Sequence, residues 1–409
     1  MLGWVLAHPS KAQGGNVSCE PVAYPFNSSE GLEISDIYAK ARESGTLLRV
    51  QLAYGEPAWL VTRYADARLV YGDNRFSRSM ALERDQPRQV PETLDEGLMS
   101  MDPPENTRLR GLIAKALTAR RVEEMRPRIR SLAEGLLDGL MAKGDTAELA
   151  AEYGFALPGA VICGLFGVPE SDHDDFIKWS NATVSTEGLT PGQAAEYRAT
   201  QHEYMMNAIA ERRARPTDDL LSGLVEARDE HDKLSEFELV VSSLGLLFGG
   251  YETVASQIPN FTLLLMENPE EWQRLIDEPD LIPNAIEELT RYVPLGTGAS
   301  FARYATEDIQ IGDVLVKRGE PVLVSIGAAN RDPEQFEGPD LIRLDRKQVQ
   351  HLGYGHGPHH CPGAALARCE LQEALRALTV KMPKLRLAGE VVWKKAMMAR
   401  APKVMPVTW

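Results

Sequence analysis

The sequence predicts a mainly α-helical protein with small β-sheets, folded as a single large domain. Apolar residues recur at helical spacing through most of residues 106–268. Two short β-rich stretches, residues 47–64 and 309–324, lie on either side of that region. No internal repeat, low-complexity tract or long flexible linker divides the 409 residues, and 44% of them are hydrophobic, which is enough for one large core.

Residues 1–20 are expected to form an irregular N-terminal extension, with the folded domain over residues 21–409. The apolar stretch Gly3–Ala7 has no basic segment before it and is far shorter than the roughly 20 apolar residues that cross a bilayer. Prolines and glycines keep the pattern irregular as far as Gly31. We therefore expect neither an export signal nor a membrane anchor.

The regular elements are expected from residue 47 onward. Leu47–Leu52 and Ala58–Thr62 predict a strand pair, because a Gly-Glu-Pro turn separates two β-rich runs. Helices are expected over residues 106–141 and, with interruptions, over residues 145–268. The expected interruptions are Gly144, Pro158, Pro169, Pro191–Gly192 and Pro216. The β-rich runs of residues 309–324 precede an irregular loop at residues 330–350 and a helix after Pro362.

The charge balance and the cysteines limit the classes of function. With 44 Lys+Arg against 59 Asp+Glu the net charge is −15, which repels nucleic acid and anionic membrane surfaces. We expect neither as a partner. The four cysteines are too few and too scattered for a disulfide scaffold, and no C-x-x-C pair suggests structural zinc. They are Cys19, Cys163, Cys361 and Cys369. We expect a monomer in a reducing cytoplasm.

The densest polar anomaly lies just before Cys361. Four of the eight histidines fall within ten residues of one another, at positions 351, 356, 359 and 360. Glycines at positions 353, 355, 357 and 363 let the backbone turn tightly and approach a flat or bulky group. The helix after Pro362 directs its first amides toward Cys361, which favours a thiolate there. A Cys/His zinc site is the alternative, but one lone cysteine at this spacing fits no structural zinc pattern.

These residues carry a resemblance to a known family. The stretch Tyr354–Gly363 (YGHGPHHCPG) resembles the haem-binding loop F-x-x-G-x-x-x-C-x-G of the cytochrome P450 family. Four further stretches resemble family motifs in family order: Asp102–Arg110, Gly249–Thr253 as the oxygen-activation sequence (A/G)-G-x-(D/E)-T, Glu288–Arg291 as E-x-x-R, and Ala329–Pro333. The resemblance covers residues 30–409 and is nearest to the soluble actinobacterial branch.

The resemblance implies the cytochrome P450 fold and a bound haem b. In that family an electron-rich thiolate ligand assists cleavage of the O–O bond. Cys361 is the implied metal ligand. The implied haem-contacting residues are Arg110, Arg303 and His359 at the propionates, together with Gly249, Tyr354 and Gly357. Asn106 stands where relatives carry a propionate-binding histidine, so one anchor is weakened to a neutral amide.

Glu252 and Thr253 are the implied catalytic residues. A carboxylate and a hydroxyl side by side in an apolar helix cost free energy unless they have partners. The structural alternative is a threonine bonded back to its own helix, with the glutamate at a solvated edge. The resemblance implies a proton relay instead, in which Thr253 steadies dioxygen and Glu252 connects it to bulk protons. Gly249 and Gly250, lacking side chains, would leave room for dioxygen and substrate.

Glu288 and Arg291 are one helical turn apart and on their own would suit an ordinary surface pair. The resemblance implies a buried structural network with Arg346, which lies eight residues before Tyr354. Two aromatic residues also depart from the family pattern. Tyr354 replaces a phenylalanine, and Tyr251 replaces a smaller or imidazole side chain.

The signals for a substrate are weaker. Residues 78–101, 176–210, 295–300 and 396–400 match the family's substrate-contacting regions. Small residues at positions 296, 298 and 299 and flexible methionines at 397 and 398 suggest a roomy apolar pocket. The alternative is that they simply fill loops and core.

The resemblance implies a haem-thiolate monooxygenase that hydroxylates or epoxidises a macrolide- or polyketide-like secondary metabolite. The alternatives are oxidative coupling of aromatic indole or phenol substrates, and a haem sensor without turnover. No nucleotide or flavin region remains in the chain, so we expect electrons from NAD(P)H through a separate ferredoxin reductase and ferredoxin. Residues 108–130 hold eight cations and two acids, a net charge of +6, which would attract an acidic ferredoxin.

Overall fold

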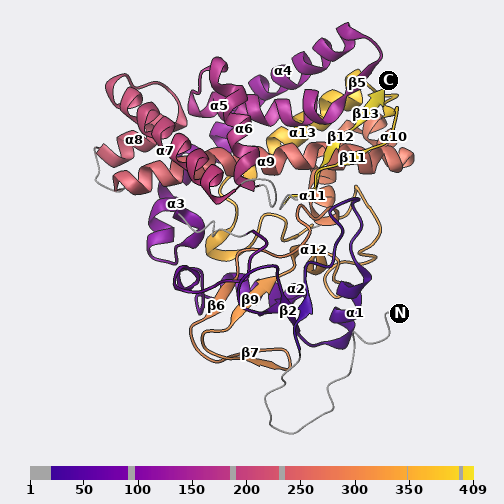
Figure 1. Ribbon diagram of the computed structural model, residues 1–409. Coiled ribbons are helices and arrows are strands. Elements are labelled where there is room, and N and C mark those ends of the chain that lie inside the picture. The colour runs from indigo at the N-terminus through magenta and orange to yellow at the C-terminus, as the bar shows by residue number, and fades with distance from the viewer. Residues whose placement is uncertain (1–19, 91–96, 185–189, 230–234, 348, 396–398) are drawn as a thin grey trace.

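The computed structural model describes residues 20–90, 97–184, 190–229, 235–347, 349–395 and 399–409. It has a helix-rich part and a β-rich part (Figure 1). Most of the long helices lie together in the helix-rich part, and the C-terminus ends there. The larger sheet lies in the β-rich part with α1, α2 and α12 around it. Most of the expected extension, residues 1–19, lies outside the described residues.

The helices carry most of the chain, as expected. They are α1 (Asp36–Ser44), α2 (Tyr64–Gly72), α3 (Glu105–Ala116), α4 (Ala119–Lys143), α5 (Ala156–Phe166), α6 (His173–Val184), α7 (Pro191–Ala214), α8 (Leu220–Asp229), α9 (Glu236–Glu267), α10 (Pro269–Asp277), α11 (Ile282–Tyr292), α12 (Ile326–Ala329) and α13 (Ala364–Lys381). The segment Ala150–Phe155 is π-helical and leads into α5.

The strands are short. They are β1 (Val22–Ala23), β2 (Leu48–Gln51), β3 (Ala58–Val61), β4 (Phe76–Ser77), β5 (Thr146–Glu148), β6 (Arg303–Ala305), β7 (Ile309–Ile311), β8 (Val314–Val316), β9 (Pro321–Val324), β10 (Arg386–Leu387), β11 (Val392–Trp393), β12 (Pro402–Val404) and β13 (Pro406–Thr408). The larger sheet has the order β1-β2-β3-β9-β6-β4. The smaller ones are β10-β13-β5, β11-β12 and β7-β8.

The two β-rich stretches meet in the larger sheet. The expected pair β2 and β3 is antiparallel, with Leu48 opposite Leu60. Strand β3 then pairs in parallel with β9, with Trp59 opposite Val322. Strand β6 is antiparallel to β9, so Arg303, at its first position, is held by a central strand of the sheet.

Helix α9 is the central helix of the helix-rich part. A capping box begins it: the Ser235 hydroxyl accepts from the Glu238 amide at 3.1 Å, and the Glu238 carboxylate accepts from the Ser235 amide at 2.7 Å. By length and composition α9 could cross a bilayer, but 61% of its most apolar window is buried inside the protein. It is therefore packed as a core helix.

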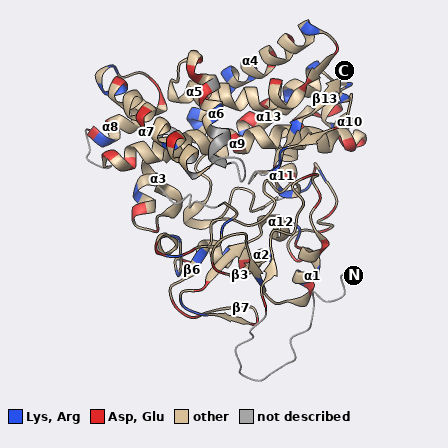
Figure 2. Ribbon diagram, in the orientation of Figure 1, with Lys and Arg blue, Asp and Glu red and all other residues tan. Residues whose placement is uncertain are grey.

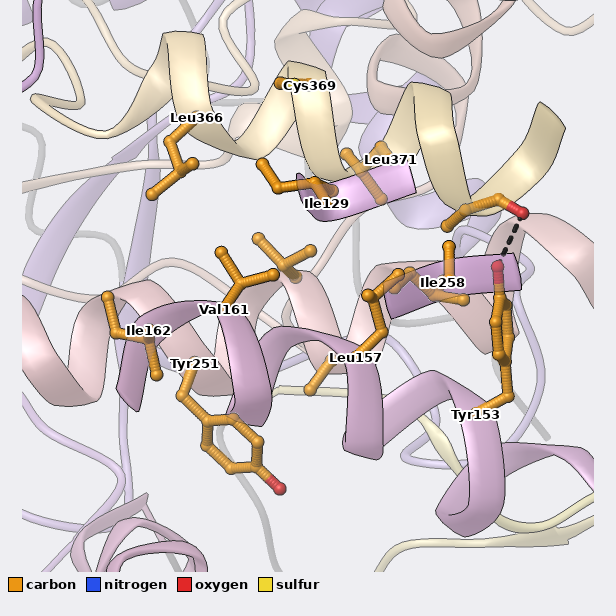
Figure 3. Packing of buried hydrophobic residues seen from close by; sticks show 14 of the residues in the cluster. Ile129, Tyr153, Leu157, Val161, Ile162, Tyr251, Ile258, Leu366, Cys369 and Leu371 are labelled. Atoms are coloured by element: carbon orange, nitrogen blue, oxygen red, sulfur yellow. Dashed lines mark hydrogen bonds between the residues drawn. The ribbon is translucent and has the colours of Figure 1, made fainter. Parts of the chain in front are cut away.

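The main core lies where α9 meets α4, α5 and α13. Figure 3 shows Leu157 and Val161 of α5 pointing toward α13, which carries Leu366 and Leu371, with Ile258 of α9 beside Leu157. The Tyr153 hydroxyl donates to a backbone carbonyl of α13 at 2.8 Å, so the one polar atom that this ring brings inside is paired.

Two expectations for the helical region were wrong. Pro158 does not interrupt a helix. It lies at the third position of α5, just after the π-helical segment Ala150–Phe155 passes into α5 without a break, so the chain changes helix type near the proline but stays helical. Strand β5 was not expected either. Its three residues show no alternation of their own and form a strand only because β13 pairs with them.

The Glu288 carboxylate lies at the centre of a fully buried ion-pair network, as the E-x-x-R resemblance implied. Arg291 binds it through two nitrogens, at 2.7 and 2.8 Å, and the Arg346 Nε binds it at 2.9 Å. The Arg343 amide donates to the same carboxylate at 3.0 Å. Arg291 also donates to the carbonyls of Asn330 and Pro339 at 2.9 and 2.8 Å. One carboxylate thus joins α11 to the loop before the cysteine segment.

Replacing this carboxylate should be severely destabilising. In Glu288→Ala two buried guanidinium groups lose their counter-ion, and we expect a loss of about 3 to 5 kcal/mol in the free energy of unfolding. Chemical denaturation followed by circular dichroism measures it. Glu271→Ala, which removes only the partly exposed pair with Arg274, is the control and should cost less than about 1 kcal/mol. Equal losses in the two variants would contradict a special role for Glu288.

Candidate active site

The segment before α13 is a tight loop that presents Cys361. The Cys361 amide donates to the Tyr354 carbonyl at 2.8 Å, which closes the loop. Gly357 has φ of +67°, and a Cβ at that position would collide with the Tyr71 carbonyl of α2. Glycine is therefore required there both by backbone conformation and by close approach. The resemblance implied a contact role for Gly357, and the structure shows how closely the loop packs on α2.

The surroundings of Cys361 have opposite effects on the pKa of its thiol. Burial raises the pKa of its thiol, while the Gly363 amide and the guanidinium groups of Arg110 and Arg368 lower it. Arg110 is half-buried and also donates to the His360 carbonyl. Arg368 lies 4.3 Å from the Tyr354 ring centroid, so this cation contacts the loop at two points. These groups are suited to stabilise a thiolate.

The other cysteines lack such surroundings. Burial raises the pKa of Cys163 to about 12 and that of Cys369 to about 11. Both belong to the main hydrophobic core. Cys19 lies outside the described residues. Cys361 is thus the candidate reactive sulfur among the cysteines that the structure describes.

A small cavity beside the loop is lined by both basic and acidic side chains. His359 and Arg303 lie there together with Tyr71, Asp73 and Asp102. The Arg303 Nε and the His359 Nε2 are buried without a hydrogen-bond partner among the described residues. Burial, followed by the charges of Arg303 and Arg78, lowers the pKa of His359 to about 3. Burial also lowers the pKa of Arg303 to about 10. The cavity therefore favours an anionic group with free acceptor oxygens.

Asn106 contacts His359, which lines this cavity. Its side-chain nitrogen is 3.5 Å from the His359 Nδ1 and donates to the Leu98 carbonyl at 3.2 Å. Its side-chain oxygen is buried and has no partner within the part of the chain that the structure describes. Asn106 thus sits against an implied anchor, although the expected histidine is missing.

The histidines do not converge. His351 pairs with Glu287 at 3.2 Å, whereas His359 faces Asn106. The His356 ring packs against Gly72: a Cβ added at Gly72 would lie 3.5 Å from that ring. The described residues contain no group of three or more His, Cys, Asp or Glu side chains placed to hold a metal ion. This geometry gives the zinc alternative no support.

Helix α9 exposes a narrow strip although most of its residues are buried. Gly245, Gly249 and Thr253 are exposed and follow one another at four-residue spacing, so they share one face. A Cβ at Gly245 or Gly249 would meet nothing within 4 Å. The Thr253 hydroxyl donates to the Gly249 carbonyl at 2.9 Å, which is the back-bond named as the structural alternative.

Gly250 does not serve the same purpose as Gly249. A Cβ there would approach the Ile162 side chain of α5 to 2.6 Å. The expectation that both glycines leave room for dioxygen and substrate is therefore wrong for Gly250, which allows two helices to pack closely. Tyr251 also faces the core: it is buried against Phe176 of α6, with ring centroids 5.8 Å apart, and beside Gly159 of α5.

Glu252 is neither solvated nor free. The residue is only 3% exposed, so the solvated-edge alternative is wrong. The Lys394 Nζ, just after β11, binds the Glu252 Oε1 at 3.0 Å, and the Ser256 hydroxyl lies 3.4 Å from the same oxygen. Lys394 was missed at the sequence level. Nothing local marks it, because the contact joins residues that are distant in the chain.

The expected substrate-side turn is only partly open. A Cβ at Gly298 would strike Pro25 and Tyr24, and Ala299 is buried in a small core with Tyr24. These two positions pack on the N-terminal segment rather than line a roomy pocket, so the core-filler alternative holds for them. Gly296 pairs with Ala399 in an isolated bridge. Met397 and Met398 lie outside the described residues.

Acidic residues of other helices pair with several cations of residues 108–130, so the positive charge there is smaller than the sequence alone indicates. Arg126 and Arg130 bind Glu373 of α13 at 2.8 and 2.7 Å, and Arg108 binds Glu238 of α9. Figure 2 shows acidic and basic residues together on the outer helices. Arg120 and Arg121 remain exposed at the start of α4, with Arg120 bound to Glu124 at 2.9 Å.

Comparisons with known proteins show the family to which the chain belongs. The cytochrome P450 family model matches residues 28–379. The chain is 50% identical to a mycinamicin IV hydroxylase/epoxidase of Micromonospora griseorubida over 96% of this chain and 100% of that protein. The crystal structure of HinD with NMFT and NO superposes with a TM-score of 0.93 at 44% identity, covering 96% and 100% of the two chains.

A third similarity bears on the reaction. The crystal structure of cytochrome P450mel 107F1, described as having biaryl coupling reactivity, gives a TM-score of 0.91 at 37% identity over 95% of this chain and 100% of that one.

These findings define a haem-thiolate class of enzyme. The chain belongs to the cytochrome P450 family and is a monooxygenase. The residues present fit a haem. The cavity beside the cysteine loop offers buried, unpartnered donors at His359 and Arg303 that carboxylates would satisfy, and the glycines of the loop admit a close approach.

Proposed function

We propose that this P450 inserts one oxygen atom from dioxygen into a macrolide- or polyketide-like secondary metabolite, by hydroxylation or epoxidation. One observation carries the proposal: the exposed strip on α9 ends at Thr253, and the buried carboxylate of Glu252 is its neighbour in the chain. The full-length similarity to a mycinamicin IV hydroxylase/epoxidase supports the substrate class. We further propose a cytoplasmic, monomeric enzyme.

In this proposal Cys361 would bind the iron of haem b as a thiolate. His359 and Arg303 would hold the propionates, with Arg110 of α3 beside them, and Gly249, Tyr354 and Gly357 would contact the macrocycle. The bound haem would supply the iron at which dioxygen takes up two electrons and two protons, so that one oxygen atom passes to the substrate and the other leaves as water.

The residues of α9 then supply geometry and protons. Gly245 and Gly249 leave the helix face open to dioxygen and substrate. The Thr253 hydroxyl is oriented by the Gly249 carbonyl, which accepts a hydrogen bond from it. Glu252 provides the next proton-carrying group toward solvent. This acid-alcohol pair favours oxygen insertion over radical coupling, because insertion requires positioned proton donors.

Electrons are proposed to come from NAD(P)H through a ferredoxin reductase and a ferredoxin. The exposed arginines at the start of α4 support docking of an acidic partner, since complementary charge speeds association. The ion pairs to Glu373 and Glu238 reduce the local excess of positive charge, so the attraction is weaker than a charge of +6 implies.

The axial ligand can be tested by spectroscopy. The ferrous-carbon monoxide complex of the wild type should show the red-shifted absorption that marks thiolate ligation, because the sulfur donates charge to the iron. Cys361→His should lose that band, and the control Cys369→Ala should keep it. A Cys361→His spectrum identical to that of the wild type would exclude this assignment.

The reaction can be tested with isotopic oxygen. Purified enzyme, ferredoxin, reductase and NADPH are incubated with a macrolide substrate under ¹⁸O₂, and product masses are read. We expect a product that gains one ¹⁸O atom. A product made of two aromatic substrates less two hydrogens, without ¹⁸O, would instead support coupling, for which the similarity to P450mel 107F1 is the motive.

The docking surface can be tested by reversing charge. Arg120→Glu combined with Arg121→Glu should slow reduction by ferredoxin roughly tenfold at low salt and flatten its salt dependence. Stopped-flow absorbance measures both quantities. Arg386→Glu, on the exposed strand β10, is the control and should leave the rate unchanged. Unchanged rates in the double variant would place docking elsewhere.

A further inference from the structure

Glu252 of α9 is held by only one of its two carboxylate oxygens. The Lys394 Nζ binds Oε1 at 3.0 Å, and the Ser256 hydroxyl lies 3.4 Å from the same atom. The second oxygen, Oε2, is buried and has no hydrogen-bond partner among the described residues. A buried carboxylate oxygen without a donor is costly, so its persistence calls for a function.

Lys394 is itself fixed from several directions. Its side chain is 13% exposed, and its ammonium lies 4.0 Å from the Phe155 ring centroid. Its backbone amide donates to the Ala401 carbonyl at 2.9 Å across the β11-β12 hairpin. The cation therefore lies where α9, the π-helical segment and the C-terminal hairpin meet. Ion pairing and the aromatic ring together compensate for its burial.

This arrangement determines which carboxylate oxygen of Glu252 can take part in proton transfer. Thr253 follows Glu252 directly, about 100° further around the helix, on the exposed strip. Lys394 and Ser256 both lie at Oε1. Among the described residues Oε2 has no partner, so it is the oxygen left to accept a proton and pass the same proton on. An untethered carboxylate would share its time between orientations and lose that selection.

We infer that Lys394 is a positioning residue for proton delivery: it ties Oε1 of Glu252 to the C-terminal hairpin and keeps Oε2 available as the proton-carrying oxygen. This inference rests on the proposed oxygen-inserting function. Lys394 touches neither substrate nor haem in this account, and it acts only through Glu252.

The chain supplies a matched control. Lys395 is the next residue, belongs to the same hairpin and is exposed, with its ammonium 3.3 Å from Glu30. Lys395→Met removes the same charge without touching Glu252. Lys394→Met removes the tether, and Lys394→Arg keeps a cation in its place.

The first measurement needs no substrate. Infrared difference spectra between each holoenzyme and the same protein carrying Glu252→Gln isolate the bands of the Glu252 carboxylate. In the wild type, Lys395→Met and Lys394→Arg we expect the bands of an ion-paired carboxylate. In Lys394→Met those bands should shift or be replaced by the band of a neutral acid, because a buried carboxylate without its cation is unfavourable. Unchanged bands in Lys394→Met would overturn the inference.

The second measurement follows protons during turnover. In Lys394→Met the solvent deuterium isotope effect on dioxygen consumption should rise. The product formed per NADPH should fall by about tenfold. This loss is smaller than the roughly 10²-fold or larger loss expected when a general acid itself is removed. Lys394→Arg should restore both values, and Lys395→Met should match the wild type. An isotope effect in Lys394→Met equal to that of the wild type would overturn the inference.

Failure of the proposed function can be told apart from failure of this inference. If no macrolide is oxidised, the infrared test still reports whether Lys394 holds Glu252. If Lys394→Met does not accumulate as folded protein, Lys394→Gln keeps a hydrogen-bond donor without the charge and should give the same changes at smaller size. Normal infrared bands and isotope effect in Lys394→Gln would overturn the inference.

Discussion

One buried carboxylate, that of Glu288, holds together the part of the protein on which the cysteine loop depends. Arg291 and Arg346 are both buried cations, and Glu288 is the carboxylate that they share as a counter-ion. Arg291 then binds the Asn330 carbonyl, and the Asn330 side chain accepts from the Leu352 amide at 2.7 Å, nine residues before Cys361. The position of the sulfur thus depends on the Glu288 network of α11, to which these hydrogen bonds link the cysteine loop.

Helix α9 shows how a core helix can carry polar groups. Its neighbours bury most of its surface, so each hydroxyl and carboxylate needs either a partner or an opening. Thr253 has both, a carbonyl of its own helix and an exposed face. Glu252 has a lysine brought by the C-terminal hairpin. The two adjacent glycines have different roles. Gly249 leaves the exposed face of α9 without a side chain, and Gly250 allows α5 to pack closely against α9.

The sequence was informative where local chemistry decides the structure. The strand pair around Gly55 and the tight loop before Cys361 could be predicted, because a turn and a glycine pattern are local. The buried role of Glu288 was implied only by the family resemblance, since helical spacing alone suits a surface pair. The sequence was uninformative where a distant contact decides. Pro158 fits inside α5, Gly298 packs on Pro25, and Lys394 reaches Glu252 only once the chain has folded. Expectations for residues 1–19 remain predictions.

The electrostatics of the site support an anionic cofactor group. Arg303 and Arg78 crowd His359, and the nearby Asp102 is already occupied, since it accepts from the Ser77 hydroxyl and from the Arg78 amide at 2.7 Å. Asp102 keeps its charge when it accepts from these neutral groups, and that charge raises the pKa of His359. Burial and the charges of Arg303 and Arg78 outweigh it and lower the pKa of His359 to about 3. Carboxylates bound at the unpartnered nitrogens of His359 and Arg303 would satisfy them and stabilise the fold by their binding energy.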